Sequence, residues 1–229
     1  MNSLNYQPIY DIAELCSQKG VSHAILCPGS RCVPLTIAFS RHAAITTRSI
    51  SDERSAGFIA LGIAQQTKAP AVLLCTSGSA AYNFSPAVAE AFYQQIPLLV
   101  FTADRPKEWI DQFDGQTINQ IGIYGSHCKK SFELPQDYHH PDAQWHINRI
   151  VNEATNLAME FPQGPVHINA PFREPLYPSS SEIIGYSKSP RIIESLEGTG
   201  NLPSKEIEKI RNDLASFTKI LILAGQDDY

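Results

Sequence analysis

The sequence has no excess of basic residues and no long apolar segment. Lysine and arginine number 18 against 23 aspartate and glutamate residues, a net charge of −5. A chain of this charge is a poor partner for nucleic acid or for an anionic membrane surface. No apolar run is long enough to cross a bilayer, and residues 1–7 lack the basic and apolar regions of a signal peptide. We therefore expect a cytoplasmic protein without a membrane span.

Cysteine is scarce, and its spacing does not indicate a metal site. The cysteines are odd in number, widely spaced and mostly next to apolar segments: Cys16, Cys27, Cys32, Cys75 and Cys128. No pair has metal-ligand spacing, so we predict reduced thiols and no metal site in this chain. We expect all five to be small buried core residues. Cys32 has a second interpretation, because a thiol in a loop beside Arg31 could be reactive.

The sequence does contain a regular alternation of strand and helix signals. Short runs typical of strands occur at 23–27, 44–49, 70–75, 97–102, 130–134 and 165–169. Helical patterns occur at 9–19, 54–67, 81–94 and 143–161, with a further helix that ends near 41. This order indicates parallel βαβ units with helices on both faces of the sheet. The predicted fold is therefore a doubly wound α/β sheet.

The composition changes after this series. Between 170 and 203, proline, serine, glycine and charged residues replace the periodic pattern, as is typical of a linker. We predict a first domain at 1–178, a linker at 179–203 and the truncated start of a second α/β domain at 204–229. That start would hold a helix at 205–217, a strand at 219–223 and a turn at Ala224-Gly225. Because a strand and turn alone cannot bury their own surface, we expect a longer parent protein.

Glu53 is the most informative single residue. It stands where the strand at 44–49 gives way to the helix at 54–67, directly before the apolar run 56–61. A carboxyl group between a buried strand and a buried helix face loses water, which favours its protonated form. Such an acid can exchange a proton with a ligand near neutral pH. The alternative is an ordinary acidic residue at a helix N-terminus, stabilised by the helix dipole.

Four polar loops follow predicted strands and would meet at one edge of the sheet. They are Cys27–Arg31, Ser51–Arg54, Cys75–Ala80 and Thr102–Pro106. Ligands of doubly wound sheets bind beyond the carboxyl ends of the strands, so these loops are the candidate site. Together with Asp114–Gln120, they resemble the N-terminal pyrimidine-binding domain of thiamine-diphosphate enzymes. The motifs that carry the resemblance are Pro28-Gly29-Ser30-Arg31, Asp52-Glu53-Arg54, Thr76-Ser77-Gly78 and Thr102-Ala103-Asp104-Arg105-Pro106.

The resemblance runs from about residue 10 to 178 and includes two later motifs, at 125–127 and 171–177. It implies that thiamine diphosphate is the cofactor and that Glu53 bonds N1′ of its aminopyrimidine ring. The activated cofactor would lose the proton from thiazolium C2, attack a 2-keto acid and release carbon dioxide. It also makes Thr76, Ser77 and Gly78 candidate cofactor contacts. The alternative for these three residues is a cap of the following helix.

The motifs are most similar to those of transferases in menaquinone biosynthesis, which decarboxylate 2-oxoglutarate and add the succinyl group to isochorismate. This similarity implies that Ser30, Arg31, Arg105 and Gln116 bind isochorismate. Arginine suits that task, because its guanidinium group binds a carboxylate through two hydrogen bonds. The local alternatives are a solvated Arg31, an Arg105 paired with Asp104, and a Gln116 that bonds its own loop backbone.

The sequence lacks one motif that the family needs. No Gly-Asp-Gly segment with a downstream asparagine is present. In the family this motif binds Mg²⁺ (or Mn²⁺) and the diphosphate, and it lies in a C-terminal domain. The family's active site also forms between two subunits of a homodimer or homotetramer. The resemblance therefore implies that this chain is an N-terminal piece of the enzyme and is inactive alone.

Two other interpretations remain open. One is a different thiamine-diphosphate enzyme, such as an acetolactate synthase or a 2-keto acid decarboxylase. Such enzymes usually have Ser-Gly-Pro-Gly where this chain has Ser77-Gly78-Ser79-Ala80, and this difference argues against them. A non-catalytic α/β module that binds small anions would explain the missing diphosphate half. A nucleotide-binding Rossmann domain is disfavoured, because no Gly-x-Gly-x-x-Gly follows the first strand.

Overall fold

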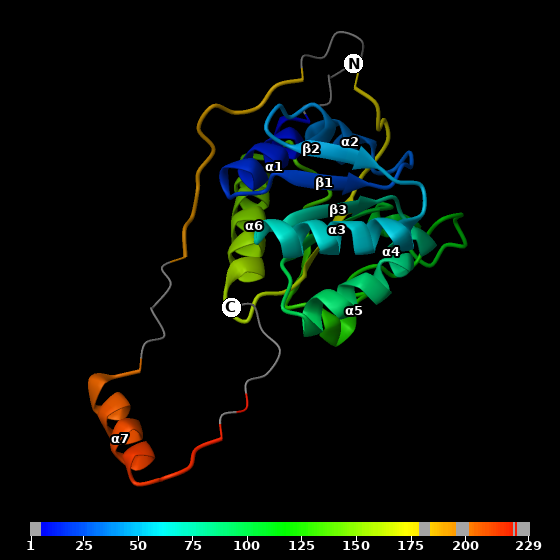
Figure 1. The fold of residues 1–229 in the computed structure, drawn as a ribbon. Helices are drawn as coiled ribbons and strands as arrows, with labels where there is room; N and C mark the ends of the chain where they lie inside the picture. The colour runs from blue at the N-terminus through cyan, green and yellow to red at the C-terminus, as the bar shows by residue number, and fades with distance from the viewer. Residues whose placement is uncertain (1–5, 179–183, 196–201, 222, 224–229) are drawn as a thin grey trace. The chain divides into compact units, whose positions relative to one another are not determined.

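The computed structural model describes residues 6–178, 184–195, 202–221 and 223. Six parallel strands form one sheet, in the order β2-β1-β3-β4-β6-β5. They are β1 (His23–Leu26), β2 (Thr46–Ser49), β3 (Ala71–Cys75), β4 (Leu98–Asp104), β5 (Ser131–Glu133) and β6 (Val166–Pro171). Helices cover both faces of the sheet (Figure 1). The predicted doubly wound α/β fold is confirmed.

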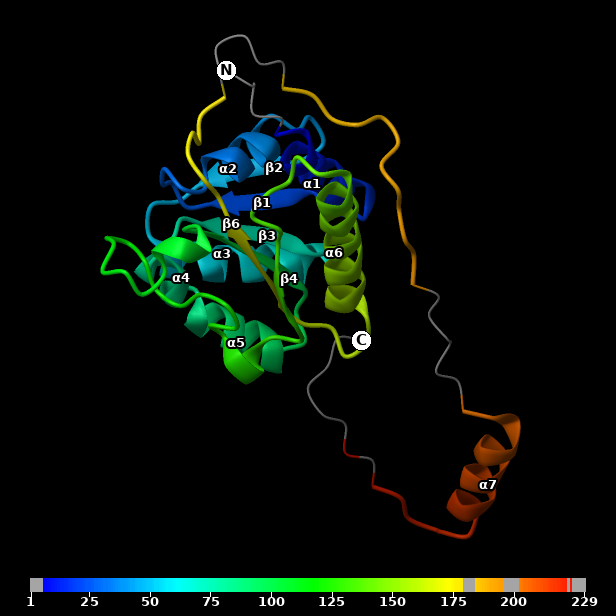
Figure 2. The same ribbon diagram turned by 180° about the vertical axis from the view of Figure 1, so that it is seen from behind.

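The helices divide between the two faces of the sheet (Figures 1 and 2). One face is covered by α1 (Gln7–Gln18), α2 (Val33–Ser40) and α6 (Pro141–Met159). The other is covered by α3 (Glu53–Thr67), α4 (Ser79–Asn83) and α5 (Ser85–Tyr93). Two 3₁₀ turns, η1 (Lys107–Trp109) and η2 (Gly125–His127), lie in the long connection after β4. Because both faces are covered, every residue of β3 and β4 is buried.

Local sequence signals explain where the helices begin and end. Pro8 lies in the first turn of α1, where its missing N–H costs no helical hydrogen bond. Gly20 follows that helix with a φ of +92°, a conformation that glycine adopts without steric cost. Asp52 caps α3, because its carboxylate accepts the backbone N–H of Ser55 at 2.7 Å. Glu53 is therefore the first residue of its helix, as predicted.

The helix predicted at 81–94 is in fact two helices, α4 and α5, which meet at Phe84. Pro86 lies in the first turn of α5. Proline has no N–H to donate to the carbonyl four residues earlier, and its ring clashes with that carbonyl. A single continuous helix therefore cannot form across this position.

The strand that precedes Glu53 differs from the prediction in its burial. β2 is an edge strand, paired with β1, and its residues are exposed except for the half-buried Thr47. The prediction that Glu53 follows a buried strand is wrong. The edge position of β2 therefore removes one of the two buried neighbours that the prediction gave to Glu53.

The segment 184–195, part of the predicted linker, packs against α1, α2 and α6. The hydroxyl of Tyr186 donates to the Ala38 carbonyl at 2.8 Å. Asn152 is fully buried on α6, and its side chain donates to the Arg191 carbonyl at 3.0 Å and accepts the N–H of Ile193 at 2.8 Å. These contacts make the segment part of the first of two structural units, 1–195 and 196–229.

The second unit contains α7 (Ser204–Ala215), which agrees with the helix predicted at 205–217. The predicted strand at 219–223 is wrong over 219–221, which have no regular secondary structure. The predicted turn Ala224-Gly225 lies outside the described residues. Across the described part of the chain, no helix combines the length and apolar character needed to cross a membrane.

Candidate functional site

A pocket of about 360 Å³ lies beyond the carboxyl ends of the strands. Its lining residues are Arg31, Arg105, Pro106, Trp109, Asp114, Arg173 and Glu174. Arg31 follows β1, Arg105 follows β4, and Arg173 follows β6. Three guanidinium groups against two carboxylates (3 − 2) give the lining one net positive charge. We call these seven residues the arginine pocket.

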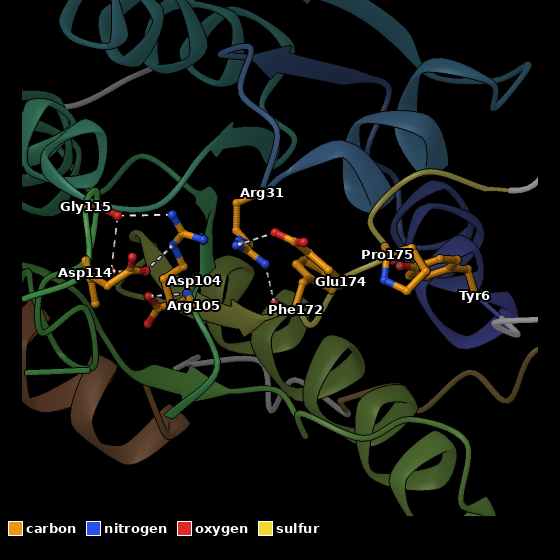
Figure 3. Close-up of polar contacts among 10 residues, drawn as sticks. Tyr6, Arg31, Asp104, Arg105, Asp114, Gly115, Phe172, Glu174 and Pro175 are labelled. Carbon is orange, nitrogen blue, oxygen red and sulfur yellow. Dashed lines mark hydrogen bonds and ion pairs between the residues drawn. The ribbon is translucent and has the colours of Figure 1, made fainter. Parts of the chain in front are cut away.

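Arg31 is buried at the base of this pocket, with 6% of its surface exposed. Its Nη1 donates to the Phe172 carbonyl at 2.9 Å, and its Nη2 lies 3.5 Å from Oε1 of the exposed Glu174 (Figure 3). Burial lowers the pKa of Arg31, and the positive charge of Arg105 lowers it further. An arginine nevertheless stays protonated at neutral pH. The two arginines therefore repel each other, and an anion bound between them would relieve that repulsion.

Arg105 is held by the loop that follows it along the chain. Its Nε lies 3.3 Å from Oδ2 of Asp114, and its Nη2 donates to the Gly115 carbonyl at 3.1 Å (Figure 3). The Nε–H is buried, and its direction toward the Asp114 carboxylate is not that of a hydrogen bond. The predicted alternative, an Arg105 guanidinium paired with Asp104, is wrong. Asp104 instead accepts the backbone N–H of Arg105 at 2.7 Å.

The loop after β1 lies directly against the loop after β3. A Cβ atom on Gly29 would fall 2.3 Å from Cβ of Thr76, so only glycine permits this approach. Thr76 and Ser77 are both buried, whereas Ser30 is exposed. None of these residues lines the arginine pocket. Their loops nevertheless start from the same edge of the sheet.

Gly78 and Gln116 form a second close contact. Gly78 has a φ of +87°, and a Cβ there would lie 3.1 Å from backbone atoms of Gln116. Gln116 itself has a φ of +58° and is exposed. Its backbone, two residues from the Arg105 partner Asp114, therefore connects the arginine pocket to the Thr76–Gly78 loop. No described residue hydrogen-bonds the Gln116 side chain, so the predicted bond to its own loop backbone is not formed.

Glu53 lies outside the arginine pocket, at the start of α3 on the opposite face of the sheet from α2. It is half-buried, and its carboxylate makes no hydrogen bond or ion pair with another described residue. The pKa of the Cys27 thiol is raised to about 12, by burial first and then by the negative charge of Glu53. Glu53 is thus within electrostatic reach of the carboxyl end of β1.

The cysteines beside the site have buried thiols. Cys27, Cys32 and Cys75 are all fully buried, and all five cysteines of the chain are free thiols. Burial raises the pKa of Cys32, which keeps its thiol protonated at neutral pH. The interpretation of Cys32 as a reactive thiol is therefore wrong, and the interpretation as a buried core residue is confirmed.

A row of buried polar side chains lies beneath the loops and was not predicted from the sequence. Its members are Thr102 and Asp104 on β4, His167 and Asn169 on β6, and Gln120 in the long loop. Thr102 Oγ1 lies 2.8 Å from both His167 Nε2 and Asn169 Oδ1. A signal was available in the sequence, because polar residues two apart in an apolar strand point to the same face.

Burial shifts the pKa values of two of these groups in opposite directions. The pKa of Asp104 is raised to about 6, chiefly by burial, although hydrogen bonds from Asn169 and the Arg105 backbone oppose the change. The pKa of His167 is lowered to about 3, also by burial. Both shifts favour the uncharged form, as expected where little water is present. At neutral pH, His167 is uncharged and Asp104 is mostly ionised.

Comparison with known proteins identifies the family to which the chain belongs. Residues 10–123 match the family described as thiamine pyrophosphate enzyme, N-terminal TPP binding domain. The chain belongs to this family of thiamine pyrophosphate enzymes. The predicted resemblance is confirmed. Within the described residues, no group of three or more His, Cys, Asp or Glu side chains is placed to hold a metal ion.

Curated relatives of the chain carry the name 2-succinyl-5-enolpyruvyl-6-hydroxy-3-cyclohexene-1-carboxylate synthase. The chain is 52% identical to the one from Cytophaga hutchinsonii over 223 residues, 97% of this chain and 40% of that protein. It is 46% identical to the one from Flavobacterium johnsoniae over 214 residues, 93% of this chain and 37% of that protein. It is 39% identical to the one from Bacteroides fragilis over 218 residues, 95% of this chain and 38% of that protein. The chain thus spans about two fifths of the length of these relatives.

The raised pKa of Asp104 predicts how the stability of the chain depends on pH. Between about pH 4 and pH 6 the folded chain holds a proton on Asp104 that the unfolded chain has lost, so this contribution to stability falls as the pH rises. A change in pKa from 3.8 to about 6 corresponds to about 3 kcal/mol. We expect the free energy of unfolding, relative to that of Asp104→Asn, to fall by about 2 kcal/mol from pH 4 to pH 6.5, because at pH 4 the unfolded chain is already partly ionised and at pH 6.5 the folded chain still holds part of the proton.

Urea unfolding of both proteins over this pH range measures the difference directly. His167 affects both proteins equally, so its opposite contribution cancels in the comparison. A difference in unfolding free energy that stays constant with pH would contradict the assignment.

Proposed function

We propose that this chain is the N-terminal part of a thiamine-diphosphate-dependent transferase, a 2-succinyl-5-enolpyruvyl-6-hydroxy-3-cyclohexene-1-carboxylate synthase. The whole enzyme would decarboxylate 2-oxoglutarate and add the succinyl group to isochorismate in menaquinone biosynthesis. The observation that carries the proposal is the arginine pocket, in a chain 52% identical to a curated synthase. Each of the two substrates has two carboxylates, and guanidinium groups are the side chains that best bind them.

The proposal assigns isochorismate to the region of Arg31 and Arg105. The mutual repulsion of these arginines and the buried Nε–H of Arg105 both favour a bound carboxylate. Ser30 and Gln116 are assigned to the same substrate, and both are exposed beside these loops. Asp114 and Glu174 are the carboxylates that lie against Arg105 and Arg31 in this chain, and Glu174 is exposed enough to move aside.

Glu53 and the loop Thr76–Gly78 are assigned to thiamine diphosphate. The Glu53 carboxyl is half-buried and without a hydrogen-bond partner among the described residues, so it fits a group that shares a proton with a ring nitrogen. The tight approach of Gly29 to Thr76 leaves the two loops close enough to form one wall of such a site. When bound, thiamine diphosphate supplies the stabilised carbanion that decarboxylation of a 2-keto acid needs.

The remaining parts of the site are proposed to come from outside this chain. The diphosphate and Mg²⁺ (or Mn²⁺) would be held by a C-terminal domain of a longer protein. A second subunit of a homodimer or homotetramer would cover the exposed side of Glu53. This division agrees with a chain that spans 40% of a relative's length, and we propose that the isolated chain is inactive. We propose the cytoplasm as its location.

The test is an assay of the longest gene product that contains this chain. It should consume 2-oxoglutarate and isochorismate together, and only with thiamine diphosphate and Mg²⁺ present. Product formation is followed by mass spectrometry and carbon dioxide release by a coupled assay. Turnover of pyruvate without isochorismate would instead support an acetolactate synthase or a 2-keto acid decarboxylase.

Glu53→Gln tests the proposed proton-sharing acid. The amide keeps the size of the side chain but cannot give up a proton, so we expect the rate of 2-oxoglutarate decarboxylation to fall by about 10²- to 10⁴-fold. Glu90→Gln is the matched control, because Glu90 is an exposed carboxylate on α5, remote from the proposed chemistry. Unchanged turnover in Glu53→Gln would rule out this role.

Arg105→Ala tests the assignment of the acceptor substrate. Loss of hydrogen bonds to a charged group costs about 1.5–3 kcal/mol, so KM for isochorismate should rise by about 10- to 100-fold. Decarboxylation of 2-oxoglutarate in the absence of isochorismate should change little. Arg149→Ala, which removes an exposed arginine from α6, should leave both measurements unaltered. A rise confined to KM for 2-oxoglutarate would overturn the assignment.

A second candidate function rests on the fact that the arginine pocket is formed by this chain alone. The chain would then be a module that binds small anions without catalysis. Isothermal titration of the 229-residue chain with isochorismate and with thiamine diphosphate separates the two cases. Binding of isochorismate combined with an inactive full-length gene product would favour the module.

A further inference from the structure

We infer that Gln120 is a positioning residue, which fixes the Thr76–Gly78 loop relative to the carboxyl end of β4, from which Arg105 follows. It is 1% exposed and lies in the long connection after β4, where it bonds both the Thr76–Gly78 loop and the carboxyl end of β4. This inference rests on the proposed function, in which the Thr76–Gly78 loop holds the cofactor and Arg105 binds the acceptor substrate. Gln120 would therefore keep the two ligands in register without touching either.

One end of the Gln120 amide binds the loop after β3, and the other end binds the neighbouring strands β4 and β6. Its Oε1 accepts the backbone N–H of Gly78 at 2.7 Å. Its Nε2 donates to the carbonyl of Ala103 at 3.1 Å and to Oδ1 of Asn169 at 3.0 Å. Glutamine can provide two donors and an acceptor in this way, whereas no apolar residue of the same length can. All of these contacts are buried, so water cannot replace them without opening the structure.

The direction of the amide is determined by a carboxylate further along the row. Asp104, when ionised, can only accept hydrogen bonds, so Asn169 must present its Nδ2 to it, at 2.8 Å. The Oδ1 of Asn169 then faces Gln120, which must present its Nε2. The Oε1 of Gln120 is left facing the N–H of Gly78. A continuous chain of hydrogen bonds therefore connects the backbone N–H of Arg105, through Asp104, to that of Gly78.

Gly78 is a point where a small displacement has a large effect. Its φ is +87°, and even a Cβ atom added to it would lie 3.1 Å from the Gln116 backbone, so the turn has little free space around it. Gly78 also precedes α4, whose N-terminus has no side-chain cap. The hydrogen bond from Gly78 to Gln120 is thus the side-chain contact that holds this turn in place.

The first experiment measures amide hydrogen exchange in the 229-residue chain by nuclear magnetic resonance, near pH 7.5. Gln120→Met removes all three hydrogen bonds and keeps the length of the side chain. We expect the Gly78 amide to exchange at least about ten-fold faster, relative to the Leu74 amide of β3, which reports opening of the sheet. Gln120→Asn, too short to reach both Gly78 and β4, is a milder second variant expected to act in the same direction.

Asn152→Ala is the matched control, because it removes another fully buried amide that also holds a distant segment, 191–193. It should leave the ratio of the Gly78 and Leu74 rates unchanged. An equal acceleration of both amides in the Gln120 variants would mean that Gln120 only stabilises the fold, and would overturn the inference.

The second experiment uses the full-length gene product. Gln120→Met should weaken thiamine diphosphate binding and raise KM for isochorismate, each by at least about ten-fold, while Asn152→Ala changes each by less than about two-fold. Cofactor binding equal to that of the unaltered protein would overturn the inference. If the unaltered protein binds no thiamine diphosphate, the proposed function and the cofactor role of Gln120 both fail. The exchange experiment still decides whether Gln120 couples the Thr76–Gly78 loop to β4.

Discussion

Parallel strand pairing brings the carboxyl ends of β1, β3, β4 and β6 to one edge of the sheet, and the position of every candidate residue follows from it. The register is specific: Cys75 pairs with Thr102, and Thr102 pairs with Asn169. The loops after β3, β4 and β6 therefore begin at nearly the same height. Because each strand is followed by a different loop, residues far apart in the sequence become neighbours in space. The arginine pocket is one result, and the buried polar row beneath it is another.

The arginine pocket combines a buried cation with weak internal partners. Arg31 is 6% exposed, so its charge has lost most of its water, and the carbonyl of Phe172 replaces only part of it. The carboxylate of Glu174 is 3.5 Å away and three-quarters exposed, so it contributes little attraction. Arg105 has a closer partner in Asp114, but in poor hydrogen-bonding geometry. The protein thus leaves both guanidinium groups able to bind a better-placed anion.

The sequence was sufficient to predict elements with strong local signals. The helix that begins at Glu53 and the arginine-bearing turn after β1 both lie where the pattern placed them. The burial of β2 was mispredicted, because burial depends on where a strand lies in the sheet and not on its own composition. Pro86, which interrupts the predicted helix at 81–94, is a signal that was present in the sequence and was missed.

Other features depend on contacts between distant residues and could not be read from a local pattern. β4 extends to Asp104, so a residue predicted to lie in the loop after this strand is instead part of the strand, is 4% exposed and has a raised pKa. The partner of Arg105 is Asp114. The path of a long loop, in which several residues have a left-handed backbone conformation, brings the two together. The hydrogen bonds of Gln120 join positions 42 and 49 residues away in the sequence.

The buried polar row explains why the loops hold one arrangement. An apolar core of the same volume would be as stable or more so. Buried polar groups lose their hydrogen bonds to water and regain only the hydrogen bonds that their partners in the protein provide. Hydrogen bonds, however, require a particular direction at each atom, and apolar contacts do not. Asp104, Asn169 and Gln120 each have their donors and acceptors matched, so an alternative loop position would leave a buried group without a partner. The row therefore favours a single loop geometry, and not a higher stability, at the edge of the sheet where the ligands are proposed to bind.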